Sequence, residues 1–155
     1  MYQKVLVPLD GSIKEVGAVL DIARGLMDVH GEGILLHVIR PGENNIVGMS
    51  LKTGARVEKE NRSRLLGYLS YFADGLNRSS AQWRCEVVVS KSVADGVIDF
   101  ADLEQVDVIV MYTHERKGLA RVFKGSVTEQ VLARAHADVR VVRPRELVSQ
   151  GAGSK

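Results

Sequence analysis

The sequence predicts a doubly wound α/β fold, in which an open parallel sheet of five strands is covered by about four helices. Short apolar runs alternate with amphipathic segments along the whole 155-residue chain, which is typical of βαβ units. The first apolar run, Val5–Val7, has no polar interruption, as expected of a strand that is buried on both faces. The pairs Gly11-Ser12 and Gly125-Ser126 each precede a predicted helix, so two strand-to-helix turns share one form.

The first strand lies within Lys4–Asp10 and is followed by a helix and a second strand. Apolar residues at helical spacing predict the helix over about Lys14–Val29, and Gly31 and Gly33 are expected to end it. Ile34–Ile39 is predicted as the second strand. The stripe of this helix that is expected in the core consists of Val16, Leu20, Ala23 and Met27.

The middle of the chain contains a long connection and a long helix. Arg40–Gly54 has no clear period and is predicted to be a loop, of a length that is often functional. A helix over about Arg56–Asn77 and a strand over Arg84–Val89 follow. The single cysteine, Cys85, is expected to be a small buried residue of that strand.

Two further helices and two further strands complete the predicted fold. Val93–Ala101 is the third helix, Val106–Met111 the fourth strand and Val127–Ala135 the fourth helix. The last strand is Val139–Val142, which Pro144 ends. The sheet is therefore expected to be Rossmann-like or flavodoxin-like, with right-handed crossovers between its strands.

Composition limits the classes of protein to which this chain can belong. A hydrophobic share of 45% suffices for one core, so we expect one domain over residues 1–145 and a disordered tail over residues 146–155. Charges of both signs are interleaved and leave a net charge of +2, so we expect no nucleic-acid partner. No run approaches the ~18 apolar residues that span a bilayer, and no signal segment precedes the first strand. We therefore expect no membrane contact and a cytoplasmic protein.

The usual nucleotide-binding fingerprints are missing, because neither Gly-x-Gly-x-x-Gly nor Gly-x-x-x-x-Gly-Lys-Ser/Thr occurs. The turn before the fourth helix nonetheless suits an anion such as phosphate, since a helix that opens on Gly125-Ser126 presents backbone N–H groups without intrahelical partners. Ser126 and Glu129 form a Ser-x-x-Glu capping box, and so do Ser12 and Glu15. Both serines can therefore equally be interpreted as plain helix caps.

A series of short motifs runs through the chain in a characteristic order. The motifs are Lys4–Ser12, His37-Val38, Asp107–Met111, Gly118-Leu119, Gly125–Glu129 and Val139–Pro144. Together they resemble the universal stress protein family, over essentially the whole chain. No single motif is very specific, so the resemblance rests on their order and spacing.

In the ATP-binding members of that family, the fourth strand is followed by Gly-x-x-Gly, nine residues and Gly-Ser or Gly-Thr. Here Gly125-Ser126 matches the second part, whereas the first two glycines fall on Tyr112 and Glu115. The resemblance implies that Asp10 binds a ribose hydroxyl and that the backbone of Val38 faces adenine, although an aspartate after a strand also commonly caps a turn. The positions that it assigns to an adenine nucleotide are Pro8, Leu9, Asp10, Val38, Met111, Tyr112, Glu115, Gly125, Ser126, Val127 and Thr128.

The loss of the two motif glycines affects one half of this predicted site more than the other. Tyr112 places a ring where the backbone would lie against the ligand, and Glu115 places a carboxylate where polyphosphate would lie. Like charges in a partly desolvated cleft repel by on the order of a few kcal/mol, or about a hundredfold in affinity. A Mg²⁺ or Mn²⁺ ion that bridges Glu115 and phosphate would reverse this effect. We expect an intact adenosine half and a compromised phosphate half.

No residue is assigned to catalysis or to a metal. No recognised motif places a nucleophile beside His114, which we interpret as an exposed loop residue. His37 is interpreted as a satisfied residue at a strand end, and His30 and His136 lie at predicted helix ends. No pair of His, Cys or carboxylate residues has metal-ligand spacing, and at most slow ATP hydrolysis is expected.

The last strand predicts a homodimer. Val139–Val142 is mostly apolar and has little sequence after it to cover a sheet edge, and such an edge tends to pair with another chain. The resemblance points the same way, because members of the family commonly dimerise through this strand.

Two functions from different classes remain open. One is a dimeric stress-response sensor that binds an adenine nucleotide, which the retained contact positions support. The other is a member of the same family that binds no nucleotide and acts through its dimer surface or the Arg40–Gly54 loop, which Tyr112 and Glu115 support. We favour the first, because the remaining contact positions are retained.

Overall fold

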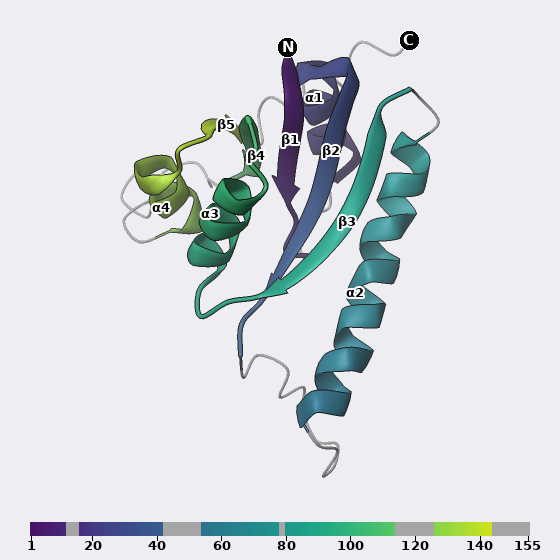
Figure 1. Cartoon of the computed structure of the whole chain (residues 1–155), viewed down its shortest axis with the longest axis vertical. Helices are drawn as coiled ribbons and strands as arrows, with labels where there is room; N and C mark the ends of the chain where they lie inside the picture. Colours follow the sequence, from purple (N-terminus) through teal and green to yellow (C-terminus); the bar gives the residue numbers. More distant parts are fainter. Residues whose placement is uncertain (12–15, 42–53, 78–79, 114–125, 144–155) are drawn as a thin grey trace.

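Five parallel strands form one sheet with helices on both faces (Figure 1). The computed structural model describes residues 1–11, 16–41, 54–77, 80–113 and 126–143. The elements are β1 (Tyr2–Pro8), α1 (Val16–Leu26), β2 (Met27–Ile39), α2 (Gly54–Leu76), β3 (Gln82–Val89), α3 (Val93–Leu103), β4 (Val108–Tyr112), α4 (Val127–Arg134) and β5 (Asp138–Val142). The strand order β3-β2-β1-β4-β5 confirms the predicted doubly wound α/β fold.

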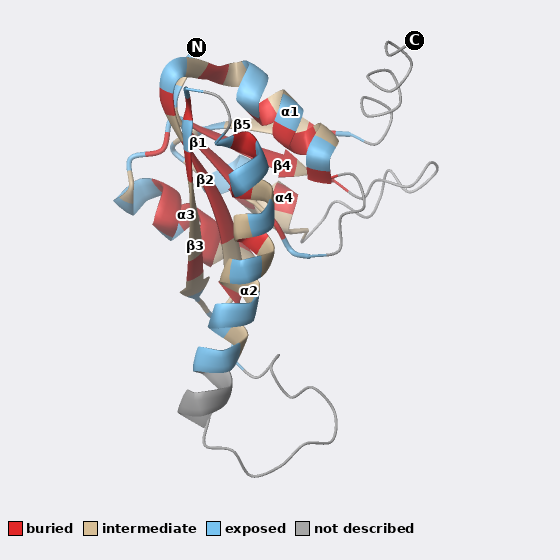
Figure 2. Ribbon diagram, turned by 90° about the vertical axis from the view of Figure 1, so that its right-hand side faces the viewer, coloured by how far each residue is buried: buried red, intermediate tan, exposed pale blue. Residues whose placement is uncertain are grey.

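Alternate residues of each strand lie in two separate cores. Helices α1 and α2 cover one face of the sheet, which we call the α1–α2 face, and α3 and α4 cover part of the other, the α3–α4 face (Figures 1 and 2). In β1, Val5 and Val7 are fully buried on the first face and Leu6 is fully buried on the second. The uninterrupted apolar run therefore reflects a strand that is covered on both sides, as predicted.

The predicted boundary between the first helix and the second strand was wrong. The helix ends at Leu26, and Met27 already begins β2, so Gly31 and Gly33 lie inside a strand and do not end a helix. Both glycines are needed for close packing. A Cβ atom on Gly33 would lie 2.3 Å from the indole ring of Trp83, and one on Gly31 would lie 2.5 Å from Cγ of Met27. His30, which was expected at a helix end, is likewise an exposed residue of β2.

Smaller differences concern other boundaries and the cysteine. Helix α2 begins at Gly54 instead of Arg56, and Val106 precedes β4, whose last residue is Tyr112. Cys85 lies in β3 as predicted, but it is half-buried and not fully buried, and this partial burial raises the pKa of its thiol. The Ser12–Glu15 capping box, most of the predicted 40–54 loop and the tail from residue 144 lie outside the described residues.

Candidate functional site

The strand order reverses between β1 and β4. After β1 the chain moves outward through β2 to β3, and it then returns to the other side of β1 as β4. Because Leu6 pairs with Ile109 in parallel register, the carboxyl ends of β1 and β4 lie side by side. Open α/β sheets bind ligands at such a switch point.

The chain after β1 is anchored to β2. The N–H of Leu9 donates to the carbonyl oxygen of Leu36 (2.8 Å), and the carbonyl oxygen of Leu9 accepts from Nδ1 of His37 (2.7 Å). The interpretation of His37 as a satisfied strand-end residue is therefore confirmed. Asp10 follows as an exposed residue, and Gly11 has a φ of +83°, a left-handed conformation that favours glycine.

The end of β2 presents the backbone of Val38 to the same region. The carbonyl of Leu36 faces β1 and that of Ile39 faces β3, where it accepts from the N–H of Ser90 (3.0 Å). The backbone groups of successive residues in a strand point alternately to its two neighbours. The N–H and C=O of Val38 therefore point to the β1 side, like those of Leu36, at a level beyond the last residue of β1. The Val38 side chain is buried against Gly96, where an added Cβ atom would lie 2.6 Å from Cγ1 of Val38.

The end of β4 brings two different side chains to the edge. Met111 is buried on the α3–α4 face, and the half-buried Tyr112 packs on the α1–α2 face. Thr113 is buried as well, and its N–H donates to the carbonyl oxygen of Val142 (3.1 Å). The ring of Tyr112 therefore packs on the opposite face of the sheet from α4.

The first turn of α4 is capped by Ser126, whose hydroxyl accepts from the N–H of Glu129 (3.1 Å). Thr128 is buried, and Val127 packs against the core of the α3–α4 face. The structure thus describes nine of the predicted positions, which lie at strand ends, directly after β1 or at the start of α4: Pro8, Leu9, Asp10, Val38, Met111, Tyr112, Ser126, Val127 and Thr128. Glu115, Gly125 and His114 lie outside the described residues.

Tyr68 of α2 was not predicted to lie near this region. Partial burial raises the pKa of its phenol, and the negative charge of Asp10 raises it further. Tyr68 therefore lies within electrostatic reach of Asp10. No pattern in the sequence indicates this proximity, because Tyr68 and Asp10 are far apart in the chain.

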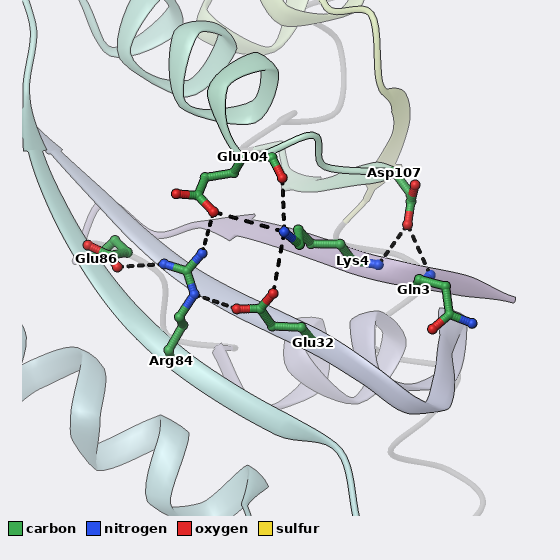
Figure 3. A network of polar contacts seen from close by, with 7 residues as sticks. All are labelled: Gln3, Lys4, Glu32, Arg84, Glu86, Glu104 and Asp107. Atoms are coloured by element: carbon green, nitrogen blue, oxygen red, sulfur yellow. Dashed lines mark hydrogen bonds and ion pairs between the residues drawn. The ribbon is translucent and has the colours of Figure 1, made fainter.

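Charged side chains gather at the amino-terminal part of the sheet, away from the predicted site (Figure 3). Arg84 contacts three carboxylates: Nε lies 2.5 Å from Glu32, Nη1 2.5 Å from Glu86 and Nη2 2.6 Å from Glu104. Nζ of Lys4 donates to the carbonyl oxygen of Glu104 (3.0 Å) and lies 3.5 Å from Glu32. We call these five residues the charged cluster. Burial would raise the pKa of Glu32, but the hydrogen bond and charge of Arg84, together with Lys4, lower it below its usual value.

The described residues contain neither a metal-binding group nor a membrane-spanning helix. No three His, Cys, Asp or Glu side chains among them are grouped so that they could hold a metal ion. No helix in the described ranges combines the length and the apolar character that crossing a membrane requires.

Comparison with known proteins gives consistent matches. The sequence model of the universal stress protein family matches residues 1–143. Universal stress protein MJ0531 of Methanocaldococcus jannaschii is 25% identical over 150 residues, which are 92% of this chain and 83% of that protein. Universal stress protein MJ0577 of the same organism is 26% identical over 155 residues, and its solved structure has a TM-score of 0.68 and covers 92% of this chain and 96% of its own.

A second similar structure contains a ligand. The universal stress protein from Archaeoglobus fulgidus in complex with dAMP has a TM-score of 0.55 and 20% identity, and the match covers 90% of this chain and 97% of that one. At this identity the similarity shows the fold alone. The family match, in contrast, covers all five strands and all four helices of the described structure. This chain therefore belongs to the universal stress protein family.

Proposed function

We propose that this protein is a cytoplasmic stress-response dimer that binds an adenine nucleotide at the carboxyl edge of its sheet and uses it for sensing or regulation. One observation supports the proposal: the chain after β1, which borders the switch point of the sheet, is anchored to the end of β2, and the helix that follows β4 in sequence has a serine-capped start. No chemical step is required of a sensor, and we assign no catalytic residue.

The adenosine half rests on Asp10 and Val38. Asp10 is exposed and lies between the anchored Leu9 and the left-handed Gly11, so its carboxylate is held in one region and is suited to accept from ribose hydroxyl groups. The N–H and C=O of Val38 face the β1 side, where they suit the donor and acceptor edge of adenine.

The phosphate half rests on α4. A helix N-terminus attracts anions through its unpaired N–H groups and its dipole, and the serine cap fixes where this helix begins. The two lost motif glycines remove the remainder of a polyphosphate cradle, so one phosphate is favoured over three. A protein of the same fold holds dAMP, which shows that the fold accommodates an adenine monophosphate.

Isothermal titration with AMP, ADP and ATP, each with and without Mg²⁺ or Mn²⁺, tests this proposal. We expect binding that weakens as phosphates are added, because Glu115 repels them, and a smaller difference when the metal ion is present. Heats indistinguishable from dilution up to millimolar nucleotide would contradict the proposal. They would favour the alternative function, an interaction protein of the same family that binds no nucleotide.

The proposed dimer contact is the edge strand β5. The N–H of Asp138 donates to the carbonyl oxygen of Asp107 and the carbonyl of Val142 accepts from Thr113, so the backbone groups of Val139 and Val141 face away from β4. Such groups can pair with a second copy of the strand. Nη1 of Arg140 donates to the carbonyl oxygen of Val141 (2.8 Å), and a partner strand would have to replace this bond.

Size-exclusion chromatography with light scattering tests the dimer, with Val141→Pro as the variant. Proline at this position removes only an N–H that faces away from β4, so we expect a folded monomer. Val89→Pro is the matched control, because Val89 ends the opposite edge strand, β3, and its N–H faces away from β2. A wild-type protein that elutes as a monomer at micromolar concentration would contradict the dimer.

A further inference from the structure

His37 makes a short hydrogen bond at the border of the candidate site. Its Nδ1 lies 2.7 Å from the carbonyl oxygen of Leu9. A carbonyl oxygen only accepts, so Nδ1 must carry the hydrogen in the neutral ring, and Nε2 is then the unprotonated nitrogen. The ring is half-buried, and Leu35 and Ile39, its neighbours on the same face of β2, are buried.

This bond extends the contact between β1 and β2 past the end of β1. β1 ends at Pro8, yet the N–H of Leu9 is still bound by the carbonyl of Leu36 and its C=O by the side chain of His37. The next residue is Asp10, and Gly11 then turns the chain with a φ of +83°. Asp10 is therefore preceded by a residue with both backbone groups bonded and followed by a left-handed glycine.

His37 also precedes Val38 directly. One side of the candidate site depends on the carboxylate of Asp10 and the other on the backbone of Val38. Asp10 lies in the turn after β1, whereas Val38 belongs to β2. His37 directly precedes Val38, and Leu9 directly precedes Asp10. The bond from His37 to Leu9 therefore connects the two residues that precede the contact positions. It thus ties the two contact positions of the adenosine half together.

We propose that His37 is a positioning residue of the nucleotide site, which holds Asp10 in place by donating from Nδ1 to the carbonyl oxygen of Leu9. This inference rests on the proposed function, since it gives His37 a part in nucleotide binding. Without the donor, the partly buried carbonyl of Leu9 loses its partner and the turn that carries Asp10 becomes mobile. Nucleotide binding must then order the turn, and affinity falls.

Three variants of the full chain separate this role from a general effect on folding. His37→Phe keeps a ring of similar size but removes the donor. His37→Asn keeps a donor, because the side-chain amide nitrogen of asparagine takes the place of Nδ1. His30→Phe is the matched control, since His30 is an exposed residue nearer the other end of the same strand.

The measurements are AMP affinity by isothermal titration, amide hydrogen exchange at Asp10 and Gly11, and ¹⁵N chemical shifts of the His37 ring. We expect His37→Phe to weaken AMP binding about tenfold and to speed exchange at both amides. His37→Asn should stay within about threefold of wild type, His30→Phe should match wild type, and the ring shifts should show the Nδ1–H tautomer.

The outcomes distinguish this inference from the proposed function. A wild-type protein that binds no AMP up to millimolar concentration overturns the proposed function and, with it, the part of His37 in binding. A wild-type protein that binds AMP, together with a His37→Phe variant that binds equally well, overturns the positioning role alone. An Asn variant as weak as the Phe variant, or an Nε2–H tautomer in the wild type, also overturns that role.

Discussion

A cluster of ion pairs distinguishes the amino-terminal part of the sheet from its carboxyl edge, whereas side chains hold backbone groups at both ends. At the amino-terminal part, long charged side chains from β1, β2, β3 and the end of α3 contact one another, with Arg84 within 2.6 Å of three carboxylates. At the carboxyl edge, the bonds described above hold the backbone: His37 binds the carbonyl of Leu9, Thr113 binds that of Val142, and Ser126 caps α4.

This difference indicates a division of roles. The side chains of the charged cluster pair with one another. The amino-terminal part of the sheet therefore contributes to stability and has little capacity to bind a charged ligand. At the carboxyl edge, bonds to the backbone fix the positions of strand ends and a helix start, which is the preorganisation that a ligand site needs. Substitutions at the two ends should therefore separate stability from binding.

The largest expected effect is on stability, from Gly33→Ala. The new Cβ would lie 2.3 Å from the Trp83 ring, so the core must shift, and we expect the free energy of unfolding to fall by about 3 kcal/mol in urea denaturation. Gly17→Ala in α1 is the matched control. It meets no atom within 4 Å and should stabilise the protein by about 0.5–1 kcal/mol. A loss below about 1 kcal/mol for Gly33→Ala would show that the indole ring moves aside easily.

The second-largest expected effect compares the two ends of the sheet directly. Arg84→Met leaves three carboxylates without their shared cation, and because the cluster is about one-third exposed we expect a loss of roughly 2 kcal/mol in the free energy of unfolding. AMP affinity should not change. Arg24→Met, which breaks a single exposed pair with Asp21 (3.2 Å), is the control and should cost less than about 0.5 kcal/mol. Equal losses for both variants would contradict a special role of the charged cluster.

Two serine caps provide a matched pair for the carboxyl edge. Ser126 caps α4 and Ser92 caps α3, and each accepts from a backbone N–H at 3.1 Å. Replacing either serine by alanine should lower the free energy of unfolding by about 1 kcal/mol. Only Ser126→Ala should also weaken AMP binding, by roughly fivefold, because only that helix start belongs to the proposed site. Similar affinities for the two variants would place the phosphate elsewhere.

The smallest effect concerns pH. The pKa of Glu32 is lowered in the folded protein from its usual value of 4.5, because Arg84 and Lys4 outweigh the effect of burial. Its contribution to stability is therefore present above that usual value and is lost as the pH falls through the lowered pKa. We expect urea denaturation below about pH 4.5 to show a decline in wild-type stability that is shallower in Arg84→Met. Parallel curves for the two proteins would contradict this assignment.

Strand-and-helix alternation was predictable because it depends on local patterns. The apolar run at Val5–Val7 and the Gly-Ser start of α4 identify a buried strand and a capped helix without any tertiary information. The order of the motifs was sufficient to indicate the family. Of the eleven predicted site positions, the nine described ones lie at the ends of β1, β2 and β4, directly after β1, or at the start of α4, because the sequence positions of these ends are local properties.

Other features could not be read from the sequence. Gly31 and Gly33 resemble helix breakers, and only the packing of Gly33 against Trp83 shows that they belong to a strand. The same holds for the face of the sheet that Tyr112 occupies, because only the structure shows that its ring packs on the α1–α2 face. Tyr68 approaches Asp10 from a helix more than fifty residues away in the chain.

The sequence by itself determined the alternation of elements, which depends on residues close together in the chain, and the family, which the order and spacing of short motifs indicated. The contact positions for a nucleotide stay a prediction. The tertiary structure decided which face of the sheet each side chain occupies and which distant groups meet. The bond from His37 to Leu9 joins residues 28 positions apart, and that from Arg84 to Glu32 joins residues 52 positions apart. Strand register brings such groups together, and register in a parallel sheet depends on the pairing of segments that are far apart in the chain.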